Sequence, residues 1–112
     1  MPNLATFLGK YKLTTEQSTE LFNDLKELEK SFDPQEIQNF YPAFEALMTQ
    51  YRIGEDDIEA FVSYLYSDQK FSNLVTYIIP SFYSLGGDHS FFEHTYDQMM
   101  SNLINEINEI NE

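Results

Sequence analysis

The chain has 112 residues and contains 19 Asp and Glu against 6 Lys and Arg, so its formal charge at pH 7 is -13. This length indicates one domain, and the acidic balance disfavours direct binding to nucleic acid or anionic membrane, because both require a basic face. Because the sequence has no cysteine, disulfides, a thiol nucleophile and thiolate metal sites are excluded.

The first half of the chain predicts helices that begin at recognisable caps. Thr14 and Gln17 form a capping box, and apolar residues recur at helical spacing over residues 21–32. Asp33 is the expected cap of a second, shorter helix. The next apolar stripe ends near Gly54, which is placed as a glycine at a helix C-terminus would be.

The second half continues the helical pattern. Asp56 is the expected cap of one helix, and residues 71–85 predict a very apolar central helix that Pro80 kinks or splits. A glycine pair at 86–87 marks a turn, and Ser90 is the expected cap of a long last helix. No stretch alternates with period two. The fold class is therefore all-α, a compact bundle of five to seven short helices.

One internal similarity relates residues 2–13 to residues 42–53, at a shift of 40. It pairs Tyr11 with Tyr51 and Lys12 with Arg52. A helical pair in every forty residues is typical of α-solenoid repeats, yet any two helix-turn-helix units phased by proline also look alike. Two pseudo-repeated helical hairpins followed by a long C-terminal helix fit either interpretation.

The C-terminal segment carries an apolar seam, in which Ile-Asn-Glu occurs three times in succession. The predicted organisation is a helical bundle over residues 1–103, with residues 104–112 as the end of the last helix or a frayed tail. Two alternatives remain for the seam: it packs on the bundle, or it forms a homodimer or partner-helix interface. The seam residues, at spacings of 4, 3, 4 and 3, are Tyr96, Met100, Leu103, Ile107 and Ile110.

Carboxylates are the candidate partner-binding residues. No Lys or Arg follows Lys70, so the negative charge of the last part of the chain is uncompensated. The acids either form a solvated surface or dock on a basic partner, with mimicry of duplex phosphates as the narrower form of the second hypothesis. The candidates on one predicted helix face are Glu16, Glu20, Asp24 and Glu27, and those at a second helix start are Glu55, Asp56, Asp57 and Glu59.

Catalytic and metal chemistry have little support in the sequence. The best metal candidates are His89, Glu93, His94 and Asp97, which helical spacing places near one another. A bundle site would also need ligands from other helices, and no second segment contains histidine. We therefore expect no metal, no cofactor and no enzymatic activity, with an acidic helix start and surface histidines in this segment.

The expected function is that of a non-catalytic, acidic interaction module. Such a module would act as a regulator or inhibitor, of the phage-inhibitor, immunity-protein or antitoxin kind, and would dock on a basic partner surface, such as that of a nucleic-acid-binding protein. The alternative is a helical adaptor, assembly module or secretion chaperone that uses the apolar C-terminal seam. The N-terminus lacks the features of a secretory signal, which makes the cytoplasm the expected compartment.

Overall fold

The computed structural model describes residues 4–111, and this part of the chain contains helices and no strand, which confirms the all-α prediction. Six α-helices lie in these residues, within the expected five to seven, together with two short 3-10 helices labelled η. In chain order the elements are α1 (Leu4–Gly9), α2 (Thr15–Lys30), η1 (Pro34–Asn39), α3 (Phe40–Gln50), α4 (Glu55–Ser67), α5 (Ser72–Ser84), η2 (His89–Phe92) and α6 (Glu93–Asn111).

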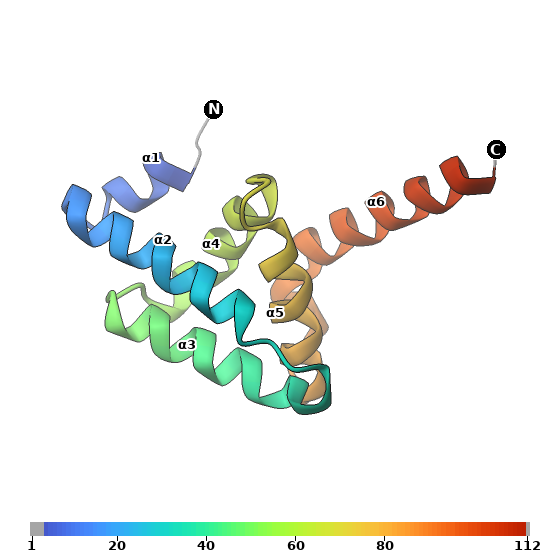
Figure 1. The fold of residues 1–112 in the computed structure, drawn as a ribbon, viewed down its shortest axis with the longest axis horizontal. Helices are drawn as coiled ribbons and strands as arrows, with labels where there is room; N and C mark the ends of the chain where they lie inside the picture. The colour runs from blue at the N-terminus through green and yellow to red at the C-terminus, as the bar shows by residue number, and fades with distance from the viewer. Residues whose placement is uncertain (1–3, 112) are drawn as a thin grey trace.

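Helix α5 occupies the centre of the bundle, as expected, and packs against α4, α3, η1 and α2 (Figure 1). Leu74, Val75, Ile78 and Ile79 on this helix are fully buried. Pro80 does not split the helix, which runs through it to Ser84. The proline is exposed, so its ring faces solvent while the opposite face of the helix stays in the core.

Helix α2 begins where the sequence predicts. The Thr14 hydroxyl accepts a hydrogen bond from the Gln17 N–H at 3.0 Å, and the Thr14 N–H donates to the Gln17 side chain at 2.9 Å. Each residue thereby satisfies a backbone donor that the helix start leaves open. Leu21 and Leu25, one turn apart, then lie fully buried against the bundle.

The caps predicted at Gly54 and Asp56 are wrong. Helix α3 ends through Arg52, which takes a left-handed conformation at φ 60°, and the Ile53 N–H donates to the Met48 carbonyl at 2.9 Å. This is the Schellman arrangement usually built on glycine. Arg52 directly follows the C-cap of α3, and a basic residue is favoured near this negative end of a helix. Gly54 instead precedes α4 as its N-cap, with no side-chain capping bond.

The cap expected at Ser90 is also displaced. The Asp88 carboxylate accepts hydrogen bonds from both the Ser90 N–H and the Ser90 hydroxyl, each at 2.9 Å. This contact starts the short helix η2, and α6 follows directly from it. The Asp88 carboxylate lies two residues before Ser90, whose N–H has no backbone acceptor at the start of the helix. It can therefore accept this hydrogen bond, which makes Asp88, rather than Ser90, the N-cap.

The two units related by the 40-residue shift share an unusual backbone feature. Among residues 4–111, Lys12 at φ 55° and Arg52 at φ 60° are the non-glycine residues with positive φ. These two residues are paired by the shift, and each ends a short helical segment before a longer helix. Left-handed basic residues are not imposed by proline or by helical period, so this geometry favours the pseudo-repeat interpretation.

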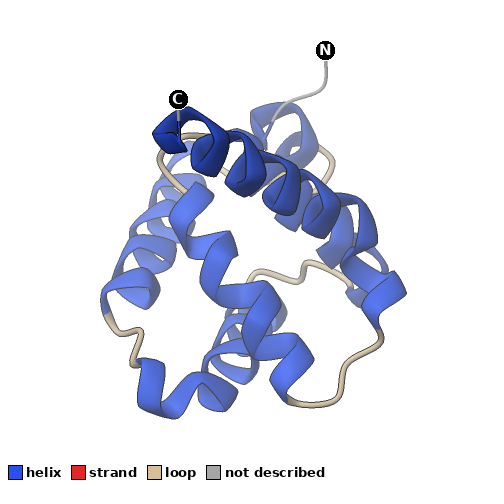
Figure 2. Ribbon diagram, turned by 90° about the vertical axis from the view of Figure 1, so that its right-hand side faces the viewer, coloured by secondary structure: helices blue, strands red, loops and turns tan. Residues whose placement is uncertain are grey.

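Helix α6 leaves the bundle after its first turns (Figure 1). Its beginning packs on α4 and η2, where Phe92 and Thr95 are buried. The side chains of residues 100–110 are all exposed. In the view turned by 90°, the helix crosses in front of the bundle (Figure 2). Residues 104–111 therefore belong to an intact projecting helix rather than a frayed tail, while Glu112 lies outside the described residues.

Candidate functional site

The predicted acidic residues lie on α2 and α4, and two of them accept hydrogen bonds from tyrosines in the turns between helices. Asp24 on α2 is half-buried and accepts a hydrogen bond from the Tyr51 hydroxyl at 2.7 Å. Tyr51 caps the end of α3, so the bond ties α2 to the turn that follows α3. Burial, followed by the Asp24 carboxylate, raises the pKa of Tyr51 to about 12.

Asp57 on α4 makes the corresponding contact with the other turn. Its carboxylate accepts a hydrogen bond from the Tyr11 hydroxyl and another from Lys10 Nζ at 3.1 Å. These bonds, with that from Tyr11 the larger influence, lower the pKa of Asp57 below its ordinary value. Burial, followed by the same contact with Asp57, raises the pKa of Tyr11. Tyr11 and Tyr51 are themselves paired by the 40-residue shift, so each unit contributes a tyrosine to a carboxylate of the other.

The other six candidate acids are exposed to solvent. Glu27 is 3.5 Å from Lys30 on the same helix, an ion pair with both side chains largely exposed. Pairs of this kind contribute little to stability. The side chains of the remaining five make no hydrogen bond or ion pair within the described part of the chain: Glu16, Glu20, Glu55, Asp56 and Glu59.

The histidine segment is divided by the junction between η2 and α6. His89 stacks on Tyr83 with ring centroids 4.2 Å apart, whereas His94 lies on α6 and faces α4. Within residues 4–111 no group of three His, Asp or Glu side chains is arranged to hold a metal ion. The helical spacing assumed for the four candidates fails because the chain starts with a 3-10 turn at His89.

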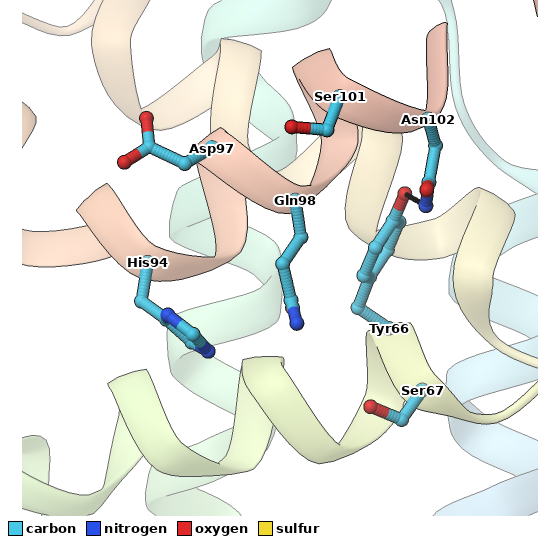
Figure 3. A pocket seen from close by; sticks show the side chains of 7 residues that line it. All are labelled: Tyr66, Ser67, His94, Asp97, Gln98, Ser101 and Asn102. Carbon is cyan, nitrogen blue, oxygen red and sulfur yellow. Dashed lines mark hydrogen bonds between the residues drawn. The ribbon is translucent and has the colours of Figure 1, made fainter. Parts of the chain in front are cut away.

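A polar hollow of about 480 Å³ lies between α4 and α6 (Figure 3). At one end the Asn102 side-chain amide donates to the Tyr66 hydroxyl at 2.7 Å, which links the two helices. His94 and Gln98 point toward α4, while the Asp97 carboxylate turns away from it. The hollow is therefore lined by polar side chains around a single helix-to-helix hydrogen bond, and its one carboxylate, that of Asp97, points away from α4.

A second hollow, of about 530 Å³, lies between the two related turns, and sequence reasoning missed it. Lys12 and Arg52 both line it, together with Tyr11, Tyr51 and Glu20. The two cations form no ion pair within 4.0 Å in the described chain. Only the 40-residue similarity pointed to this place, because it pairs the residues of the two turns.

Most of the exposed large apolar side chains of the described residues lie along one side of α6. We call the five side chains Met100, Leu103, Ile104, Ile107 and Ile110 the α6 stripe. Their exposed fractions are 37%, 46%, 53%, 48% and 82%, in that order. Apart from Leu85 these are the exposed large hydrophobic side chains of the described residues. Contiguous exposed apolar surface of this kind is typical of interaction sites.

Comparison with protein-family models, with curated proteins and with solved structures found no match to this chain. Between residues 4 and 111, no helix combines the length and the apolar character needed to cross a membrane.

Proposed function

We propose that the protein is a non-catalytic interaction module and that α6 is its docking element. One observation carries this proposal: the α6 stripe is exposed on a helix that projects from the bundle. Among the described residues, the bundle itself buries twenty large apolar side chains without help from the stripe. The stripe is therefore not required to complete the core, and the function it best fits is that of a helical adaptor or assembly module.

The energy available to such a docking element is considerable. Burying a large aliphatic side chain completely contributes about 1.5–3 kcal/mol. The five stripe residues are exposed to between 37% and 82%, so covering them offers on the order of 5 kcal/mol before the cost of association. A partner helix laid along one face of α6 would reach all five.

A second candidate is the acidic regulator or inhibitor that docks on a basic protein, with nucleic-acid mimicry as its narrowest form. The five unpaired, exposed acids on α2 and α4 favour it, as does the net charge of -13. Asp24 and Asp57 are poor members of this surface, because intramolecular hydrogen bonds occupy their carboxylates. In either case the expected compartment remains the cytoplasm.

Site-specific photocrosslinking in the producing cells tests the docking role of α6. A photoreactive residue replaces Ile110 in the stripe or, as a matched control, Asn105 on the opposite side of the same helix. We expect a discrete adduct from position 110 that disappears when Leu103→Gln is added, and none from position 105. Equal adducts from both positions, or no adduct from position 110, would refute the proposal.

A further inference from the structure

The occupant of the α6 stripe can be inferred from the charges that border it. We propose that the stripe binds the stripe of a second copy of this chain, in an antiparallel pair of α6 helices. This inference rests on the proposed function, because it names the partner of the same docking element. It requires that two copies, each of charge -13, can bring these helices together without opposing carboxylates.

The facing side of α6 is nearly free of charge. At 3.6 residues per turn, Met100, Leu103, Ile107 and Ile110 lie on one face of the helix, and Ile104 widens it. Glu109 falls on the opposite face. Glu106 is then the one carboxylate that borders the stripe between residues 100 and 110. A basic partner would find little to pair with here, whereas a second copy brings an equally neutral and equally long stripe.

An antiparallel arrangement separates the charged parts of the two copies. With the pair centred between Leu103 and Ile104, Met100 of one helix lies opposite Ile107 of the other. Glu106 then lies opposite Ser101, so no carboxylate faces another. Because α6 projects from its bundle, the two bundles come to opposite ends of the helix pair. A parallel pair would place both acidic bundles side by side.

This arrangement also covers the most exposed residue of the stripe. Ile110 is 82% exposed at the far end of α6. In the antiparallel pair it reaches the base of the other helix, beside Tyr96, whose ring packs on Tyr83. The stripe itself spans about 15 Å of helix, shorter than most stable coiled coils. We therefore expect a reversible dimer with a Kd on the order of 10 μM.

Sedimentation equilibrium of the purified chain is the first test. We expect the mass to approach twice 13.2 kDa as the concentration rises, and association to tighten with added salt, because salt screens the repulsion between two acidic copies. The variant Leu103→Gln/Ile107→Gln should raise the Kd at least about tenfold. The matched variant Asn105→Gln, on the polar side of α6 opposite the stripe, should leave it unchanged.

Three results would overturn the inference. These are a monomer at every concentration up to about 200 μM, a dimer that the stripe variant leaves intact, and a dimer that salt dissociates. If the chain is monomeric but position 110 still crosslinks to another protein, the second copy is excluded as the occupant of the stripe while the docking role of α6 stands. Circular dichroism of both variants shows whether α6 remains helical, which glutamine favours.

Engineered disulfides test the orientation, since the chain has no cysteine of its own. In the antiparallel pair, Met100→Cys mixed with Ile107→Cys should form a disulfide between copies under mild oxidation. Ile110→Cys alone should not, because the two positions lie at opposite ends of the pair. A rapid disulfide from Ile110→Cys alone would show parallel helices and refute the arrangement.

Discussion

The hydrogen bond between Tyr51 and Asp24 makes a quantitative prediction about stability. A hydrogen bond to a charged group contributes about 1.5–3 kcal/mol, and the half-buried Asp24 carboxylate places this one near the lower limit. We expect Tyr51→Phe to cost about 1.5 kcal/mol of unfolding free energy. Asp24→Asn, which keeps an acceptor but removes the charge, should cost about 1 kcal/mol.

Urea denaturation followed by far-ultraviolet circular dichroism at pH 7 measures these changes. Glu20→Gln is the matched control: it removes one charge from the same helix, one turn earlier, at an exposed side chain without a hydrogen bond. It should change stability little, or increase it slightly by relieving repulsion. In a double-mutant cycle, Tyr51 and Asp24 should show a coupling of about 1 kcal/mol. A coupling below about 0.3 kcal/mol, or an equal loss from Glu20→Gln, would refute the structural role of Asp24.

Two further predictions concern alkaline pH and the buried hydroxyl of Ser81. On folding, the pKa values of Tyr41 and Tyr51 rise from 10.0 to about 12, so their contribution to stability is complete below pH 10.0 and is lost as the pH rises through about 12. We expect Tyr51→Phe to reduce this loss, measured as the change of the urea midpoint over that pH interval. An unchanged slope would contradict this prediction. The buried Ser81 hydroxyl accepts a hydrogen bond from the Tyr41 N–H at 2.8 Å and donates one to the Ile37 carbonyl. We therefore expect Ser81→Ala to cost about 2–3 kcal/mol of unfolding free energy in the same assay. A loss below about 0.5 kcal/mol, as small as that of the exposed control Ser84→Ala, would contradict this prediction.

Local signals predicted most of the helices, because they depend on residues close together in the chain. The capping box at Thr14 and the apolar spacing of α2 and α5 are of this kind. The wrong cap at Gly54 and the unbroken helix at Pro80 both have a tertiary cause. Arg52 adopts the left-handed cap because Ile53 must turn into the core, where it is 4% exposed, and Pro80 is tolerated because it faces solvent.

The candidate acids could be located in the sequence but not sorted. Helical spacing places Asp24 and Glu20 on one face of the helix. Of the two side chains, however, only that of Asp24 accepts a hydrogen bond from a tyrosine, and that tyrosine is 27 residues away in the sequence. Asp57 is likewise distinguished from Asp56 by a contact over 46 residues. The apolar spacing of the C-terminal seam was recognisable in the sequence. Its exposure depends on where α6 leaves the bundle, which residues close together in the chain do not determine.

The two tyrosine–carboxylate contacts have a consequence for how the chain can be divided. Tyr11 reaches from the first unit to Asp57 in the second, and Tyr51 reaches back to Asp24 in the first. A fragment that stopped in the loop after α2 would retain one tyrosine and one carboxylate while losing the partner of each. The two units are therefore joined reciprocally, and neither half can satisfy both its own tyrosine and its own carboxylate without the other.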